Sequence, residues 1–357
     1  MFVETCFENR RKVGALSNGM TIYDLAQKLG LSVSTTSKAL NGYTDVKPAT
    51  RERVLTAAKE MGFEPSAAAR SITTKRSYLI GVIYHDLGGG LMNPHFSEVL
   101  EHFRRTVEAL GYQIMFVSVN DRTLLQNTRW RGLDGVVVMS YDEDSEQLDE
   151  LLSTPIPAVL TDFDHGDCAS VFSDNQAGME VIVNYLWGMG HRNYCYVSAH
   201  LNHTSGRERF DGVRDALARR GLTEKDFRVV TATGHSYLAG YRVGEELLSQ
   251  EMIGADRSLA LITASDQVAF GLCSCLKESG ISVPKDVSVT GFDDLSLEET
   301  NYWQLTTLRQ QRVRIGQEAG KLLVRQIQEG AKDSLRIRLP VSLVERGSVR
   351  RLSETDR

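Results

Sequence analysis

The sequence of 357 residues predicts an α/β protein with a small helical N-terminal part and a two-lobed body of parallel sheets flanked by helices. Residues 21–61 carry three short helical patterns separated by turn signals. From residue 78, short apolar runs alternate with helical stretches, which implies parallel sheets covered on both faces. The hydrophobic content of 41% suits a globular protein. No run approaches the roughly 18 apolar residues of a membrane span.

The segment 21–41, TIYDLAQKLGLSVSTTSKALN, predicts two short helices joined by a tight turn. Thr21 is a favoured N-cap residue, and Asp24 stands where a capping box needs its acidic partner. Ser32 caps the second helix, which is built mostly from short hydroxyl side chains and the cation of Lys38. Because so polar a helix has little to bury, it suits phosphates and base edges. The segment therefore indicates a helix-turn-helix, although a plain helical hairpin would have the same outline.

A third helix is expected over residues 48–61, because Pro48 is well suited to the first helical position. The side chains expected to pack it on the first two helices are Val54, Leu55, Ala58 and Met61. The hinge sequence PSAAARSI is too short to form a stable helix without support. We assign an N-terminal extension to residues 1–20, a helix-turn-helix domain to 21–64, and a hinge helix with its linker to 65–77.

The net charge of −5 is unevenly distributed. Residues 21–76 carry nine Lys and Arg against five Asp and Glu, whereas residues 77–357 carry a net charge of −10. A cationic head on an anionic body is expected if only the head meets phosphate. The five scattered cysteines indicate free thiols, and the charged N-terminus is unlike a signal peptide, so we expect a cytoplasmic protein.

The body, residues 78–346, is expected to form two lobes because it holds too many strands for one compact sheet. Strands are predicted at residues 79–84, 113–119, 135–140, 158–161, 194–198, 228–231, 259–263 and 287–291. Helices are predicted at residues 96–110, 145–152, 176–189, 207–220, 237–250 and 266–279. We assign residues 78–162 and 293–312 to lobe one, 163–292 and 313–346 to lobe two, and 347–357 to a tail. A small ligand is expected in the cleft between the lobes.

These features occur together with specific motifs: the hinge PSAAARSI and the body sequences YLIGVI, GHRNYCYVS, ITASDQVAFG and VSVTGFDD. Over about residues 21–346 the chain resembles the lactose/galactose repressor (LacI/GalR) family, whose bodies are like periplasmic sugar-binding proteins. The resemblance implies a transcriptional repressor controlled by a small molecule, which we expect to be a sugar or sugar derivative. It also implies a homodimer that reads a pseudo-palindromic operator in double-stranded DNA.

By the same resemblance, Val33 and Ser34 touch base edges. Lys38 matches a third reader that is usually Arg, and Lys lacks the two-pronged contact that Arg makes to guanine. Ile72 matches a leucine that wedges into the minor groove. The full set of implied DNA contacts is Thr21, Tyr23, Ser32, Val33, Ser34, Thr35, Ser37, Lys38, Asn41, Ser66 and Ile72.

In the cleft, Asp162, Arg209 and Asp293 match polar groups that hold an effector, and their charges suit sugar hydroxyls. The implied effector contacts are Phe96, Asp162, Arg209, His235, Ser265, Asp293 and Gln310. Ser265 replaces a usual Asn and Arg312 replaces an apolar residue, which suggests an additional anionic group on the effector.

Other interpretations stay open on the sequence alone. The body could bind a phosphoprotein, or the chain could be a sugar-binding protein or enzyme with a vestigial head. We find no nucleophile motif and no ligand set for a metal, so we predict no catalytic residue, metal or cofactor. Without leucine heptads in the tail we predict a dimer and not a tetramer. The sequence leaves open the effector, the operator, the sign of the response, and whether Met20 is the true start.

Overall fold

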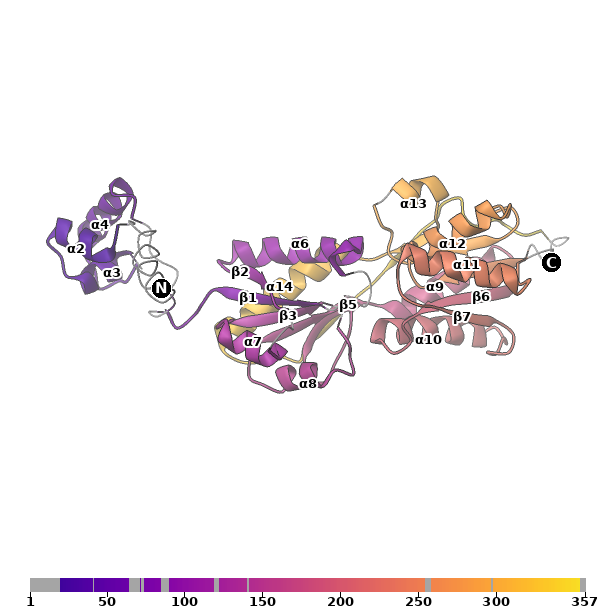
Figure 1. Cartoon of the computed structure of the whole chain (residues 1–357), viewed down its shortest axis with the longest axis horizontal. Helices are drawn as coiled ribbons and strands as arrows, with labels where there is room; N and C mark the ends of the chain where they lie inside the picture. The colour runs from indigo at the N-terminus through magenta and orange to yellow at the C-terminus, as the bar shows by residue number, and fades with distance from the viewer. Residues whose placement is uncertain are drawn as a thin grey trace, which may run out of the picture. The chain divides into compact units, whose positions relative to one another are not determined.

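The structure, a computed structural model, divides into two compact units, Met1–Ser77 and Tyr78–Arg357. Figure 1 shows the helices and strands of both. The residues it describes are 20–40, 42–63, 71, 74–84, 90–118, 122–139, 141–253, 258–296 and 298–353. The predicted DNA contacts Asn41, Ser66 and Ile72 lie outside these residues.

The head contains the three predicted helices, α2 (Ile22–Leu29), α3 (Val33–Leu40) and α4 (Pro48–Glu60). Thr21 and Asp24 form the predicted capping box, which satisfies donors at the start of α2. Gly30 ends α2 with φ 64°, a conformation that glycine adopts without strain. The Ser32 hydroxyl accepts a hydrogen bond from the Thr35 N–H at 3.0 Å, as expected of the cap of α3.

The predicted packing of α4 was wrong at Leu55, which is 49% exposed. The predicted burial of Val54 and Ala58 is confirmed, and Ala57 is buried in place of Leu55. Because an α-helix has 3.6 residues per turn, positions 54, 57 and 58 share one face, and position 55 points away from it.

Lobe one is built on a six-stranded parallel sheet in the order β11-β5-β4-β3-β1-β2. Its strands are β1 (Leu79–Tyr84), β2 (Gln113–Phe116), β3 (Gly135–Met139), β4 (Ala158–Thr161), β5 (Ala169–Ser173) and β11 (Arg336–Leu339). One face is covered by α6 (Pro94–Ala109), which follows η3 (Gly90–Met92), and by α14 (Arg312–Glu329). The other face is covered by α7 (Leu124–Trp130) and α8 (Glu146–Leu152) (Figure 1).

Lobe two is built on a four-stranded parallel sheet in the order β7-β6-β8-β9. Its strands are β6 (Asn193–Ala199), β7 (Arg228–Ala232), β8 (Leu259–Thr263) and β9 (Ser288–Thr290). One face is covered by α9 (Asn175–Gly188) and α10 (Thr204–Ala218). The other is covered by α11 (Tyr237–Ser249) and α12 (Asp266–Glu278), and α13 (Glu298–Trp303) packs on α12. The antiparallel pair β10 (Thr307–Arg309) and β12 (Ser342–Val344) completes the described strands.

The predicted division between the lobes was wrong. Residues 169–173 and 312–339 belong to the sheet layer of lobe one, because β5 pairs with β4, β11 pairs with β5, and α14 packs on α6. Conversely, residues 298–303 belong with lobe two, since α13 packs on α12. β11 and β5 pair although they lie far apart along the chain, so no local pattern reveals this pairing.

The last described residues also depart from the prediction of a separate tail. Val349 and Leu352 are buried, and the Leu352 N–H donates to Met189 O at 2.8 Å, so this segment is part of lobe two. The prediction of free thiols is confirmed for Cys168, Cys195, Cys273 and Cys275, all of which are buried. None of the described helices combines the length and apolar character needed to cross a membrane.

Candidate functional site

The predicted DNA contacts of the head lie on accessible surface. Tyr23 on α2 is 71% exposed, whereas Thr36 and Ala39 on α3 are buried. The exposed or half-buried members of the predicted set are Thr21, Tyr23, Ser32, Val33, Ser34, Thr35, Ser37 and Lys38. Their contact with DNA stays a prediction.

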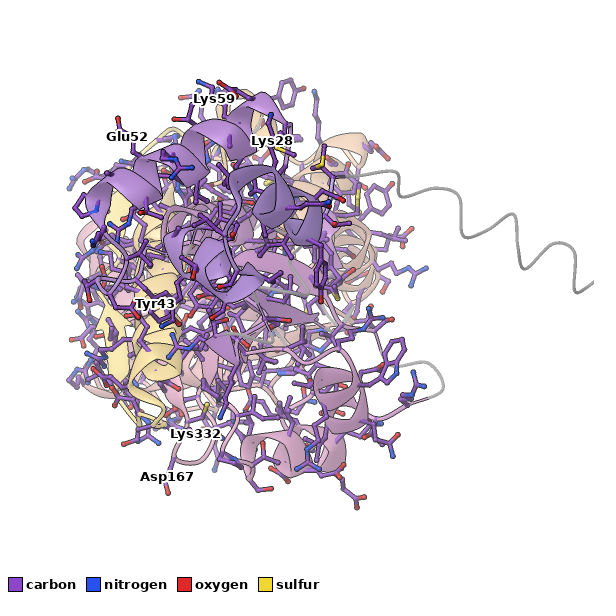
Figure 2. The ribbon with its side chains drawn as sticks, turned by 90° about the vertical axis from the view of Figure 1, so that its left-hand side faces the viewer. Lys28, Tyr43, Glu52, Lys59, Asp167 and Lys332 are labelled. Atoms are coloured by element: carbon purple, nitrogen blue, oxygen red, sulfur yellow. The ribbon has the colours of Figure 1, made fainter. Side chains whose placement is uncertain are left out.

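The Lys38 ammonium is paired with the Asp45 carboxylate, and the two side chains are 45% and 56% exposed. Exposed ion pairs are weak, so the pairing with Asp45 leaves Lys38 able to exchange this partner for a group of the DNA. Figure 2 draws further side chains of the head, including Lys28 and Lys59 in the last turns of α2 and α4 and Tyr43 in the loop after α3.

The seven predicted effector contacts come together around one pocket of the body. They are Phe96, Asp162, Arg209, His235, Ser265, Asp293 and Gln310. The cavity enclosed by the lining side chains has a volume of about 50 Å³. The structure thus brings these residues together from both lobes, and their role in binding an effector stays a prediction.

Three further residues line the pocket and were missed by the sequence analysis: Asn93, His95 and Ser205. Asn93 is the N-cap of α6, and its side chain accepts a hydrogen bond from the His95 N–H at 3.0 Å. The Asn-Pro start signal of α6 therefore marks residues that face the cleft, and it could have identified His95 beside Phe96.

Arg209 on α10 forms the wall on the side of lobe two. It is 7% exposed, and its guanidinium stacks 3.8 Å from the centre of the Phe292 ring. Nε donates to Asn175 Oδ1 at 2.9 Å, and Nη1 donates to Ala264 O at 2.5 Å. Among the described residues none accepts a hydrogen bond from Nη2, which is therefore the donor available to a ligand.

A chain of polar side chains forms the opposite wall. Gln310 accepts from the Ser173 hydroxyl at 2.6 Å and donates from Nε2 to Asp293 Oδ1 at 2.6 Å. Gln310 Nε2 also lies 3.3 Å from His95 Nδ1, and since the amide nitrogen is a donor, His95 Nδ1 is the acceptor and the ring proton is on His95 Nε2. His95 Nε2 in turn lies 3.0 Å from Asp162 Oδ2. That contact is poorly aligned, and this buried oxygen makes no well-formed hydrogen bond to the described residues. A ligand hydroxyl could donate to it.

The charges around the pocket do not favour an anion. Burial, together with the positive charge of Arg209 and the neighbouring His200, holds the pKa of His235 well below its usual value, so its imidazole is neutral. Two carboxyl groups, Asp162 and Asp293, then face the single guanidinium of Arg209. This set suits an uncharged ligand with several hydroxyl groups.

The interpretation of Arg312 as a partner for an anionic effector was wrong. Arg312 is not part of the pocket lining. Its side chain is 6% exposed, and it donates to the backbone carbonyls of Asp293 and Asp294 and to Glu98 Oε2. Three protein acceptors therefore occupy its guanidinium.

Asp266 lies behind the pocket and is fully buried. Its carboxyl group accepts hydrogen bonds from the Leu295 N–H at 2.9 Å and from the Thr307 hydroxyl at 2.5 Å. Burial and the nearby charge of Asp293 raise the pKa of Asp266 to about 7.

Glu143, after β3 of lobe one, bonds to the start of α10 in lobe two. Its carboxylate accepts from the Thr204 N–H at 2.6 Å, from the Thr204 hydroxyl at 2.8 Å and from Arg207 Nη2 at 2.9 Å. Burial alone would raise the pKa of Glu143, but the hydrogen bonds from His203, Thr204 and Arg207 outweigh burial and lower it. The contact therefore joins an ionised carboxylate to a helix N-terminus across the two lobes.

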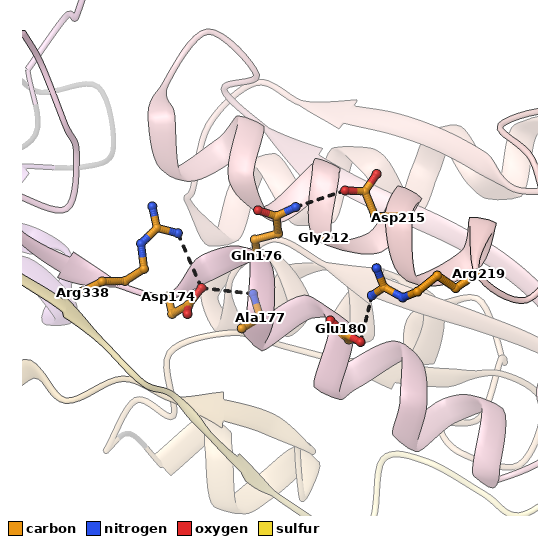
Figure 3. Close-up of a pocket in the computed structure, with 8 residues that line it drawn as sticks. All are labelled: Asp174, Gln176, Ala177, Glu180, Gly212, Asp215, Arg219 and Arg338. Carbon is orange, nitrogen blue, oxygen red and sulfur yellow. Dashed lines mark hydrogen bonds and ion pairs between the residues drawn. The ribbon is translucent and has the colours of Figure 1, made fainter.

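A larger hollow of about 300 Å³ lies beside α9 and α10, and Figure 3 shows its lining. Its charged groups bond to one another. Arg219 pairs with Glu180 at 2.8 Å, and Gln176 Nε2 donates to Asp215 Oδ2 at 3.0 Å. Because these side chains already satisfy one another, the first pocket is the better candidate for a ligand.

Comparisons with known proteins agree on the two parts. Residues 21–66 match the family of bacterial regulatory proteins, lacI family, and residues 183–349 match a periplasmic binding protein-like domain. The chain is 29% identical over 339 residues to catabolite control protein A of Priestia megaterium, covering 90% of this chain and 96% of that protein.

Two solved structures are similar to the whole fold or to its body. A lac repressor dimer bound to operator and the anti-inducer ONPF matches with a TM-score of 0.78 at 25% identity, covering 93% of this chain and 100% of that one. A LacI family transcriptional regulator from Enterococcus faecium with bound ribose matches with a TM-score of 0.67 at 26% identity, covering 77% of this chain and 100% of that one.

Proposed function

We propose that the chain is a DNA-binding transcriptional repressor of the LacI family, controlled by a sugar or sugar derivative. The effector binds in the pocket between the lobes, and its binding changes the affinity of the head for a specific operator. The function is regulatory and not enzymatic. Because its target is bacterial DNA, the protein acts in the cytoplasm.

The observation that carries this proposal is the composition of the pocket. A stacked guanidinium whose Nη2 group bonds to no described residue faces a buried carboxylate oxygen without a well-formed partner. Both suit the alternating donors and acceptors of sugar hydroxyls. The similar regulator from Enterococcus faecium was solved with ribose, which supports a carbohydrate as the class of effector.

For DNA, α3 is the reading helix, and Val33, Ser34 and Lys38 are its base contacts. Ser66 and Ile72 of the hinge complete the contact in the minor groove, where an apolar wedge can unstack a base step. The similar lac repressor is a dimer on its operator, which supports a homodimer on a pseudo-palindromic site for this chain.

The DNA-binding part is tested by fluorescence anisotropy with labelled DNA from beside the protein's own gene. We expect nanomolar binding that a scrambled sequence of equal length does not reproduce, and we expect Ser34→Ala to reduce this preference. Each lost base contact is worth about 1–3 kcal/mol. Equal affinity for both sequences by a folded dimer would overturn the proposal.

The effector part is tested by adding a panel of sugars, including D-ribose, to the operator complex. A sugar that releases DNA is an inducer, and one that tightens binding is a corepressor. Arg209→Ala should abolish the response, whereas Arg219→Ala, in the second hollow, should retain it. A full response from Arg209→Ala would exclude this pocket as the effector site.

A further inference from the structure

The loop after β9 holds two consecutive residues in a conformation that is unusual for non-glycine side chains. Asp293 has φ 138° and Asp294 has φ 54°. Such positions are strained, and they persist only where the surrounding structure enforces them. In this loop the strain directs the Asp293 carboxyl group into the effector pocket, where Gln310 donates to it at 2.6 Å.

The guanidinium of Arg312, the first residue of α14, bonds to the main chain of both residues. Nη1 donates to the Asp293 carbonyl, and Nη2 donates to the Asp294 carbonyl at 3.0 Å. Nε donates to Glu98 Oε2 at 2.6 Å, which fixes the plane of the guanidinium from α6. Two parallel donors in one rigid plane fit two successive carbonyls, a contact that a Lys ammonium does not reproduce.

The side chain of Asp294 holds the same loop from its other side. Its carboxylate accepts from Arg309 Nε and from Arg346 Nη2, both at 2.6 Å. The main chain holds Asp293 as well, because its N–H donates to Leu308 O at 2.8 Å and its carbonyl accepts from the Gln310 N–H at 3.4 Å. The Arg312 guanidinium is the side-chain group that bonds to the carbonyls of both Asp293 and Asp294.

We propose that Arg312 is a positioning residue for effector recognition, which acts by holding the backbone of Asp293 and Asp294 so that the Asp293 carboxyl group faces the pocket. The inference rests on the proposed function for its consequence, but the geometry can be tested without any effector. Because Arg312 lies on α14 and Glu98 on α6, the Arg312 guanidinium also connects the loop of Asp293 to two packed helices of lobe one.

The first experiment compares glycine with alanine at position 293 by urea unfolding of the full chain. Both replacements remove the same carboxyl group, so their difference reports the backbone conformation. With Arg312 present, Asp293→Gly should unfold at higher urea than Asp293→Ala. In an Arg312→Met background the loop relaxes to negative φ, and the order should reverse. An order that stays the same in both backgrounds would overturn the proposal.

The second experiment measures operator release by D-ribose and the other sugars of the panel. Arg312→Met should weaken the effective sugar affinity about tenfold, measured against the operator affinity of the same variant without sugar. Arg314→Met, an exposed neighbour on α14, is the matched control and should behave like the wild type. If the wild type responds to no sugar, the proposed function fails and the glycine–alanine comparison still decides the inference. An Arg312→Met variant with wild-type sugar response would overturn the positioning role.

Discussion

Replacing Glu143 by Gln should loosen the contact between the lobes at the start of α10. The Glu143 side chain is buried and receives two short hydrogen bonds from Thr204. Hydrogen bonds to a charged group contribute about 1.5–3 kcal/mol each. A Gln side chain keeps one acceptor oxygen but turns an NH₂ group toward donors. We therefore expect a loss of about 2 kcal/mol, or roughly 30-fold in the equilibrium between the closed and the open contact.

The measurement is hydrogen exchange of the Thr204 amide in the full chain, because Glu143 is its acceptor in the closed contact. Exchange should be about 30-fold faster in Glu143→Gln, by the same conversion. Glu150→Gln, an exposed carboxyl change on α8, should leave this rate unchanged. An unaltered Thr204 rate in Glu143→Gln would refute the reasoning.

The same contact should respond to acid. Since the folded structure lowers the pKa of Glu143, the contact is fully stabilising above the unfolded pKa of about 4.3 and weakens as the pH falls through the lower folded value. Glu143→Gln should lack this dependence. Opening matters for function because the pocket volume of about 50 Å³ is well below the roughly 300 Å³ of ordinary ligand sites, so a sugar needs the lobes to separate.

Three further predictions concern stability and DNA binding. Gly271→Ala should destabilise the body by about 3 kcal/mol in urea unfolding, because its Cβ would lie 1.8 Å from a backbone oxygen of α11, whereas Gly188→Ala, with nothing within 4 Å, should be neutral or slightly stabilising. Asp266→Asn should flatten the pH dependence of the free energy of unfolding. In the wild type the folded chain keeps a proton on Asp266 up to about pH 7, whereas the unfolded chain loses it near pH 4, so stability falls as the pH rises across this range. Equal slopes for the two proteins would contradict the assignment. Asp45→Asn should tighten operator binding in anisotropy titrations, because the change removes a carboxylate near the DNA and leaves the Lys38 ammonium free for its base contact. Unchanged binding would place Lys38 away from DNA.

The pocket residues were predicted from the resemblance to the LacI/GalR family, and two of them also stand at recognisable local signals. Asp162 ends a buried strand, and Ser265 caps a helix directly after one, so both stand at the carboxyl edge of a parallel sheet. His95 carried a weaker signal and was missed. Arg312 was misread, because residue type alone does not tell which way a long side chain turns at a helix start.

The helices of the head, their caps and the alternation of strands and helices in the body could be predicted from the sequence. These features depend on neighbours a few residues apart, so turn signals and apolar periodicity are sufficient to predict them. That β11 and α14 belong to lobe one, and that Glu143 joins the two lobes, is visible only in the folded structure. The partners in these contacts lie far apart along the chain, and they are selected by packing and hydrogen bonding in the assembled fold.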